Sequence, residues 1–235
     1  DLLIKYVLTH TLKSAPGVEG WLIAPTYKQA KQNLWRRTLA YLAYPNNWLL
    51  AGEPNGNELT IPLIDGHVIA LKGSEDPGSL RGPNLGVAGF DEHAYNRKHV
   101  ELWERVVQPA LSDKMGRALF ESSFNGMEDF YKLWEYAETR GDPDWKAWLI
   151  TTEEAMTVPP QEIARLRRTM HPDDFNQEYG CIPYRTEGLA AREFVNRMYP
   201  EGNLIGVDAW ERVRKDYVFL AAADWARSSG RTGRL

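Results

Sequence analysis

Two adjacent carboxylates follow an apolar run in the middle of the chain. Residues 86–90 read Gly-Val-Ala-Gly-Phe, and Asp91 and Glu92 come directly after them. An apolar strand buried on both faces would deliver this pair to the carboxyl edge of a parallel sheet, where ligands bind. There the Asp can hold Mg²⁺ through its water shell, and the Glu can orient a water against a γ-phosphate. The alternative is a strand that ends in a solvated acidic turn.

Two hydroxyl side chains, Ser122 and Ser123, lie at the end of a second strand-like run over residues 117–122. If this strand neighbours the Asp-Glu strand, its terminal hydroxyls can sense the γ-phosphate and pass its loss to the next helix. That helix is predicted over residues 127–139 from its apolar spacing. The alternative is that Ser123 or Asn125 caps this helix.

One arginine, Arg81, stands in a glycine-containing loop that enters the Asp-Glu strand. The loop reads Gly-Ser-Leu-Arg-Gly over residues 78–82. An arginine held there can place a positive charge near phosphate oxygens during phosphoryl transfer. The alternative is a solvated turn arginine, which is the commoner case for an arbitrary protein.

No phosphate-binding loop of the Gly-x-x-x-x-Gly-Lys-[Ser/Thr] type occurs in the chain. However, residues 1–13 form the kind of helix that follows such a loop, and residues 20–24 form the kind of strand that comes next. We therefore expect that the chain begins immediately after a phosphate-binding loop and is a fragment of a longer protein. The alternative is a helix with no such loop before it.

The composition is that of an ordinary soluble globular protein, with 43% hydrophobic and 26% charged residues among 235. The net charge of −4 excludes a basic nucleic-acid coat protein, although a local basic surface can still contact DNA. A single cysteine, Cys181, excludes an internal disulfide and a cysteine cluster for zinc. No apolar run is long enough to predict a membrane span.

Histidines and a basic patch offer weaker signals. His93 is adjacent to Glu92, but we expect it to pack or be solvated rather than to take part in catalysis. Arg165, Arg167 and Arg168 form a basic patch on a predicted helix. We interpret this patch as a solvated face, and the alternative is contact with DNA or with a neighbouring subunit.

Apolar runs and helical patterns alternate over the first 150 residues. This alternation predicts a mostly parallel α/β sheet flanked by helices. The Asp-Gly pair at Asp65 predicts one β-hairpin within it. The predicted strands cover residues 20–24, 58–64, 67–71, 85–90, 117–122 and 147–151. The predicted helices cover residues 1–13, 27–42, 96–111 and 127–139.

The pattern changes after Thr152. Two helices are predicted, over residues 159–170 and 172–179, and no strand is visible in this stretch. Residues 217–223 then form a continuous apolar run that ends in Asp224. We interpret the helical part as a small subdomain or linker, and the apolar run as the first strand of a second α/β domain that the chain does not complete.

Five short motifs occur in a fixed order along the chain. They are Ala-Pro-Thr-Tyr-Lys-Gln-Ala-Lys from Ala24, Leu-Arg-Gly from Leu80, Gly-Phe-Asp-Glu-His-Ala-Tyr from Gly89, Ser-Ser-Phe-Asn-Gly from Ser122 with Phe-Tyr-Lys-Leu-Trp from Phe130, and Pro-Asp-Asp-Phe-Asn-Gln-Glu-Tyr from Pro172. As a set they resemble the large subunit of tailed-phage terminases. The resemblance runs from about Leu2 to Asp224, which is nearly the whole chain.

The resemblance implies roles for individual residues. Asp91 would be the Walker B magnesium ligand, and Glu92 would be the catalytic base. Ser122 and Ser123 would belong to the coupling motif that links hydrolysis to DNA movement. Arg81 would be a phosphate-sensing or finger arginine.

The resemblance also implies a domain organisation. Residues 1–152 would form a P-loop NTPase domain of the ASCE type, with a mostly parallel sheet and truncated after its P-loop. Residues 153–214 would form a helical linker subdomain. Residues 215–235 would begin an RNase H-like nuclease domain, with Asp224 as its first metal-binding aspartate.

The intact protein would use ATP and Mg²⁺ to drive double-stranded DNA into a viral procapsid, and two divalent metal ions, Mg²⁺ or Mn²⁺, to cut concatemeric DNA. Its implied partners are a portal protein, a small terminase subunit and further copies of itself in a ring on the procapsid. It would act in the host bacterial cytoplasm or be encoded by a prophage, with no membrane. The fragment alone is expected to be inactive. Alternatives are a related P-loop DNA translocase or helicase, or an inactive prophage-derived DNA-binding or assembly module.

Two positions depart from the family pattern. Phe124 stands where proline is usual in the coupling motif, so the local turn is expected to differ. His171 stands where Ser or Thr usually caps the helix at Pro172, and we expect histidine to be a poorer cap.

Overall fold

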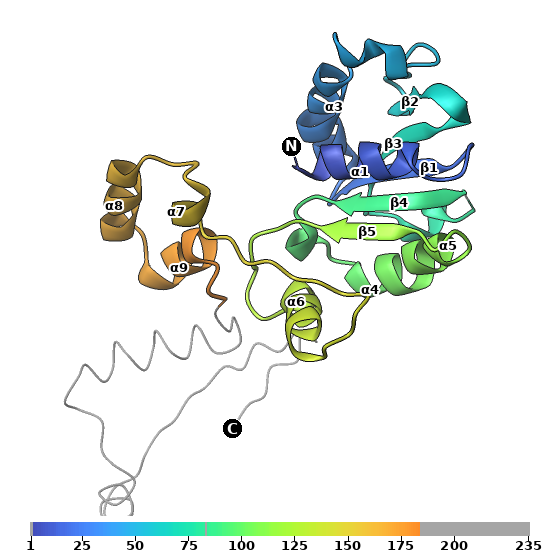
Figure 1. Cartoon of the computed structure of the whole chain (residues 1–235). Helices are drawn as coiled ribbons and strands as arrows, with labels where there is room; N and C mark the ends of the chain where they lie inside the picture. Colours follow the sequence, from blue (N-terminus) through green and yellow to red (C-terminus); the bar gives the residue numbers. More distant parts are fainter. Residues whose placement is uncertain (1, 83, 184–235) are drawn as a thin grey trace, which may run out of the picture. The chain divides into compact units, whose positions relative to one another are not determined.

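The structure is a computed structural model that describes residues 2–82 and 84–183 (Figure 1). These residues belong to a compact unit that spans Asp1–Tyr184. The strand predicted over residues 217–223 and Asp224 lie outside the described residues. The domain boundaries predicted at residues 152 and 214 stay predictions.

A five-stranded sheet forms the centre of the described unit. Its strands are β1 (Glu19–Ala24), β2 (Thr60–Pro62), β3 (Val68–Gly73), β4 (Leu85–Phe90) and β5 (Arg117–Phe120), in the order β2-β3-β1-β4-β5. β1 is parallel to both β3 and β4, and β5 is parallel to β4, whereas β2 pairs antiparallel with β3. The prediction of a mostly parallel sheet with one hairpin is therefore confirmed.

Alternate residues of β1 face two separate hydrophobic cores. Leu22 packs in one core with α1 (Leu2–Leu12), whereas Trp21 and Ile23 pack in the other with Trp103. The sheet is thus covered by helices on both faces. Strands that are buried on both faces appear in a sequence as continuous apolar runs, and this is why β1 and β4 were predictable.

Two long helices each contain a π-helical segment. The first consists of α2 (Tyr27–Gln29), η1 (Ala30–Trp35) and α3 (Arg36–Tyr41). The second consists of α4 (His99–Leu102), η6 (Trp103–Val107) and α5 (Gln108–Ser112). The second helix was predicted to begin at Asn96, but the Asn96 side chain instead accepts a hydrogen bond from the Lys98 backbone N–H at 3.0 Å. This turn delays the start of the helix to His99.

Glycines in β4 let α1 lie directly on the sheet. A Cβ on Gly89 would meet the side chains of Leu3 and Val7 at 2.9 and 2.6 Å, and a Cβ on Gly86 would meet the Ser14 hydroxyl at 3.2 Å. Leu3 lies in the first turn of α1, and Ser14 lies just beyond its end. Helix and strand therefore run in opposite directions, and the first turn of α1 lies at the carboxyl end of β4.

The chain after β5 is helical in its described part. Its helices are α6 (Asp129–Thr139), α7 (Thr152–Ala155), α8 (Pro160–Thr169) and α9 (Pro172–Gly180). The strand predicted over residues 147–151 is wrong, because these residues form no strand. Trp148 and Ile150 are each 61% exposed, so this apolar run does not reflect burial in the sheet. The short helix α7 was not predicted.

The ends of these helices differ in detail from expectation. Thr151 caps α7 in a capping box with Glu154. His171 does cap α9, since its Nδ1 accepts a hydrogen bond from the Asp173 backbone N–H at 3.3 Å, which is long for such a bond. None of the helices in residues 2–82 and 84–183 is both long and apolar enough to cross a bilayer.

Candidate functional site

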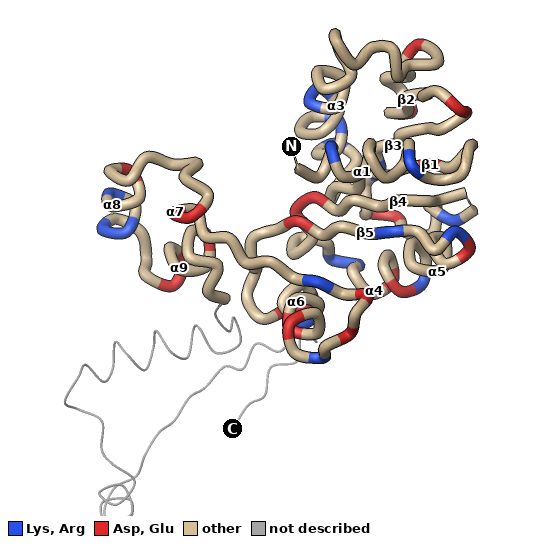
Figure 2. The backbone as a smooth tube through the Cα atoms, viewed as in Figure 1, with Lys and Arg blue, Asp and Glu red and all other residues tan. Residues whose placement is uncertain are grey.

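Strand β4 carries Asp91 and Glu92 to the carboxyl edge of the sheet. All six residues of β4 are buried. The backbone N–H of Asp91 donates to the Ile23 carbonyl of β1 at 2.8 Å, so the pair leaves the sheet beside the end of β1. Parallel α/β sheets bind their ligands at this edge. Figure 2 shows acidic positions where β4 and β5 end.

The backbone at Glu92 is left-handed, with φ 51° and ψ 45°. This conformation is uncommon for residues other than glycine, and residues that adopt it gather at functional sites. Two hydrogen bonds from the following residues hold it. The His93 N–H donates to the Glu121 carbonyl at 3.2 Å, and the Ala94 N–H donates to the Ser122 hydroxyl at 3.1 Å. The chain that follows β5 therefore fixes the turn that presents Glu92.

Ser122 also contacts the Glu92 side chain. Its hydroxyl donates to Glu92 Oε2 at 3.5 Å, which is at the outer limit for a hydrogen bond. β5 was predicted to reach Ser122 but ends at Phe120, so Ser122 lies in the loop beyond the strand. The structure thus brings Glu92 and Ser122 together beside Asp91, while the roles proposed for these residues stay predictions.

Burial and neighbouring charges alter both carboxyl groups. Burial raises the pKa of Asp91, and the nearby Arg37 guanidinium acts in the opposite direction. Burial also raises the pKa of Glu92, the charges of Asp91 and Glu178 raise it further, and the Ser122 hydrogen bond lowers it. An added cation would stabilise carboxylates that are crowded in this way.

The oxygen donors at this edge fit a magnesium ion. Mg²⁺ prefers oxygen ligands, and it is usually bound by one or two carboxylates together with waters and substrate phosphates. Asp91, with Glu92 beside it, meets that description. No group of three or more His, Cys, Asp and Glu side chains among the described residues could hold a metal ion. The site therefore suits a metal that arrives with a phosphate ligand.

The first turn of α1 lies at the same edge as the carboxylates. Leu3 of this turn packs against Gly89, two residues before Asp91. The free N–H groups and the dipole at a helix N-terminus favour anions such as phosphate. An edge that suits a cation thus adjoins a helix end that suits an anion, and a magnesium nucleotide needs both.

Two other predicted residues are less closely tied to this edge. The Ser123 side chain interacts with the Tyr95 hydroxyl, three residues after Glu92. Arg81 is exposed in the chain between β3 and β4, and it forms no hydrogen bond or ion pair with the rest of the described chain. The structure therefore does not bring Arg81 into contact with Asp91.

Two charged residues at this edge were not predicted from the sequence. Arg37 of α3 acts electrostatically on Asp91. Glu178 of α9 acts on Glu92, and its Oε1 accepts a hydrogen bond from the Tyr95 hydroxyl at 3.4 Å. Glu178 stands in one of the five ordered motifs, which was a usable signal. Arg37 stands in an ordinary helical pattern and offered none.

His93 is buried, which agrees with the packing interpretation. Its side chain contacts the rings of Phe90, Phe120 and Phe130, and its Nε2 pairs with His99 Nδ1. Burial lowers the pKa of His93 to about 3, so the ring is neutral near pH 7. His93 therefore anchors the turn at Glu92 in the core and is a poor candidate for a base.

The basic patch on α8 is largely engaged in ion pairs. Arg165 pairs with Glu162 at 2.5 Å, and Arg167 pairs with Glu153 at 2.6 Å. All four side chains are exposed, as on the solvated face that we expected. Contact of this patch with DNA or with a neighbouring subunit stays an alternative.

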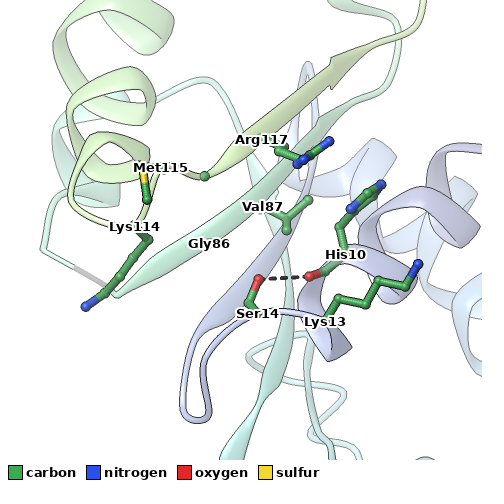
Figure 3. A pocket seen from close by; sticks show the side chains of 9 residues that line it. His10, Lys13, Ser14, Gly86, Val87, Lys114, Met115 and Arg117 are labelled. Atoms are coloured by element: carbon green, nitrogen blue, oxygen red, sulfur yellow. Dashed lines mark hydrogen bonds between the residues drawn. The ribbon is translucent and has the colours of Figure 1, made fainter.

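A hollow of about 310 Å³ lies at the opposite edge of the sheet, where β4 and β5 begin (Figure 3). Lys13, Lys114 and Arg117 contribute positive charge to its lining. Figure 3 shows that the ends of the Lys13 and Lys114 side chains point in different directions and do not converge on one point. We therefore place the candidate site at the carboxyl edge rather than in this hollow.

A family comparison matches most of the chain. Residues 7–190 match the family described as Terminase large subunit, T4likevirus-type, N-terminal. The match covers well over half of the chain, and the chain belongs to this family. The resemblance drawn from the five ordered motifs is thereby confirmed.

Curated relatives carry the name "Terminase, large subunit". One comes from Thermus phage G20c and another from Thermus virus P23-45. Each is 26% identical, over 72% of this chain and 40% of the relative. The chain therefore spans about two fifths of the length of the curated relatives that it matches.

Solved terminase structures share the fold. The Thermus Phage P74-26 Large Terminase ATPase domain is similar with a TM-score of 0.61 and 22% identity, over 76% of this chain and 79% of that one. The large terminase of another thermophilic bacteriophage, in complex with ADP, has a TM-score of 0.59 and 17% identity, over 78% and 44%. At these identities the likeness establishes the fold, a mixed α/β sheet with flanking helices that is consistent with a P-loop NTPase.

Proposed function

We propose that this chain belongs to an ATPase that drives double-stranded DNA into a viral procapsid. The placement of Asp91 and Glu92 at the carboxyl edge, beside the first turn of α1, carries the proposal. Relatives named as terminase large subunits and a related large terminase with bound ADP support it.

Asp91 would hold the magnesium ion of a magnesium nucleotide, and Glu92 would act on the attacking water. Bound Mg²⁺ neutralises negative charge on the transferring phosphoryl group. Glu92 accepts the proton of the water, and it is well suited to this because burial and the charges of Asp91 and Glu178 raise its pKa. Ser122 holds one oxygen of Glu92 and leaves the other for the water.

The remaining site residues are proposed to sense the nucleotide. Ser122 and Ser123 lie between the turn at Glu92 and helix α6, so a change at the turn reaches α6 through them. Arg81 is proposed as the phosphate-sensing or finger arginine. Its exposure and its lack of a partner in the described chain leave its guanidinium available to phosphate.

The intact protein is further proposed to cut concatemeric DNA with an RNase H-like nuclease domain. Asp224 would supply one ligand to two divalent metal ions, Mg²⁺ or Mn²⁺, that activate phosphate for displacement. The portal protein, the small terminase subunit and a ring of copies on the procapsid are the proposed partners, in the host bacterial cytoplasm. Replacing Asp224 with alanine in the complete protein should abolish metal-dependent plasmid cleavage, and undiminished cutting would contradict this role.

The ATPase proposal is tested by one substitution and a matched control in the complete protein that contains this chain. Glu92→Gln keeps the shape of the side chain but removes its basicity, and should slow ATP turnover by about 10²-fold or more. Glu138→Gln makes the same change at an exposed position of α6 and should leave turnover unchanged. Near-normal turnover of Glu92→Gln would refute the proposed function.

A further inference from the structure

Helix α9 is joined to the loop after β5 by a buried hydrogen bond. The Gly126 backbone N–H donates to Gln177 Oε1 at 2.7 Å. The Gln177 side chain is only 5% exposed. Gly126 has φ 71°, a conformation that glycine adopts readily. A buried N–H group needs an acceptor, so Gln177 is the group that keeps this loop in place.

The next residue of α9, Glu178, contacts the turn after β4. Its Oε1 accepts a hydrogen bond from the Tyr95 hydroxyl at 3.4 Å, which is long and exposed to solvent. Consecutive side chains of α9 therefore contact two different loops, one after β4 and one after β5. The buried contact of Gln177 is the stronger of the two.

The loop held by Gln177 begins at Ser122, which fixes the turn at Glu92. The Ser122 hydroxyl accepts the Ala94 N–H at 3.1 Å and contacts Glu92 at 3.5 Å. Between Ser122 and Gly126, the Phe124 side chain is buried against the aromatic rings of α6. Residues 122–126 are thus anchored at one end by the turn at Glu92 and at the other by Gln177.

Helix α9 is itself held mainly by its helical neighbours. Its Phe175 is buried, and the Arg167 guanidinium of α8 lies 5.0 Å from the centre of the Phe175 ring. The Cys181 thiol, just after α9, donates to the Ile150 carbonyl at 3.3 Å. A displacement of α7, α8 and α9 would therefore carry Gln177 with it.

We propose that Gln177 is a positioning residue through which the helical segment, residues 151–183, controls the turn at Glu92. This inference rests on the proposed ATPase function of that turn. While Gln177 holds Gly126, Ser122 stays against Ala94 and Glu92, and the turn is set for hydrolysis. Displacement of α9 frees Gly126 and loosens Ser122. By reciprocity, a change at the turn alters how firmly α9 is held.

The test replaces the acceptor without shortening the side chain. Gln177→Met in the complete protein removes Oε1, and Gln161→Met makes the same change at an exposed position of α8 as the matched control. Hydrogen exchange of short peptides that contain Gly126 is measured by mass spectrometry. ATP turnover is measured over a range of ATP concentrations, which separates kcat from KM.

We expect Gln177→Met to speed exchange at Gly126 and to lower kcat, each by about tenfold, while KM for ATP stays close to that of the wild type. Gln161→Met should change neither. Unchanged exchange at Gly126 would overturn the inference, and so would faster exchange with an unchanged kcat. A wild-type protein without ATPase activity would refute the proposed function instead, while the exchange result would still show whether Gln177 holds the loop.

Discussion

The sheet and the helical segment of residues 151–183 are stabilised in different ways. All six residues of β4 are buried, whereas α7, α8 and α9 together bury only Ile163, Phe175 and Gln177. The helical segment relies more on exposed ion pairs such as that between Arg167 and Glu153. Exposed ion pairs contribute little, so the segment has much less free energy holding it together.

This difference separates two tasks that the proposed ATPase must perform. The carboxylates stand on a rigid strand, which fixes their geometry. The helix that contacts them belongs to a region of low local stability, and such regions are the ones that open and move. A stiff site controlled by a soft segment can respond to small changes in how that segment is held.

The largest expected difference between the two regions comes from matched leucine truncations. Leu22 in β1 is fully buried, so Leu22→Ala should lower the free energy of unfolding by about 2–5 kcal/mol. Leu166→Ala in α8 should cost clearly less, because Leu166 is only partly buried. Chemical denaturation of both variants measures this, and equal losses would break the comparison.

Packing between α1 and β4 is tested by adding one methyl group. Gly89→Ala would place a Cβ 2.6 Å from Val7 and 2.9 Å from Leu3, and should destabilise the protein by about 1–3 kcal/mol. Gly52→Ala is the control, because its new Cβ meets only Pro62 at 3.4 Å. Thermal unfolding compares the two, and a tolerated Gly89→Ala would show that α1 is less tightly packed than the structure indicates.

His93 predicts how the rigid region responds to acid. Burial lowers its pKa from 6.5 to about 3, so folding favours the neutral ring. This contribution is complete above pH 6.5 and is lost as the pH falls toward 3, by up to about 1.4 kcal/mol per pH unit. His93→Phe removes the titrating group and should flatten this part of the stability profile. Parallel profiles from denaturation of the two proteins would contradict a buried neutral His93.

The smallest expected effect lies on the surface of the helical segment. Arg167→Ala removes an exposed ion pair with Glu153 and the contact with the Phe175 ring, and should cost about 1 kcal/mol or less. Hydrogen exchange should speed up in α7–α9 and stay unchanged in the sheet. Arg168→Ala is the control on the same helix. Faster exchange in β4 would show that the two regions are coupled more strongly than the contacts suggest.

The sheet was predictable because its strands are buried on both faces. Their apolar runs gave the bounds of β4 without error, and the Asp-Gly pair at Asp65 located the hairpin. The run over residues 147–151 was misleading, because apolar character alone does not show whether a segment is buried. Trp148 and Ile150 are exposed, and only the tertiary structure reveals this.

The site was predictable only in part, for a related reason. Asp91, Glu92 and Ser122 follow strands, so their place at one edge could be inferred from local patterns. The bond between Gly126 and Gln177 joins positions 51 residues apart and leaves no local pattern in the sequence. Contacts of this kind depend on how the helices pack, which propensity and spacing do not determine.

The central claim is that Asp91 and Glu92 divide the metal and water roles between them. Single-turnover measurements on the complete protein test it most directly, by following nucleotide binding and hydrolysis separately in Asp91→Asn and Glu92→Gln. Glu92→Gln should bind ATP with magnesium about as tightly as the wild type but hydrolyse it about 10²-fold more slowly or worse. Asp91→Asn should weaken binding only when magnesium is present. Hydrolysis by Glu92→Gln at the wild-type rate would contradict the account.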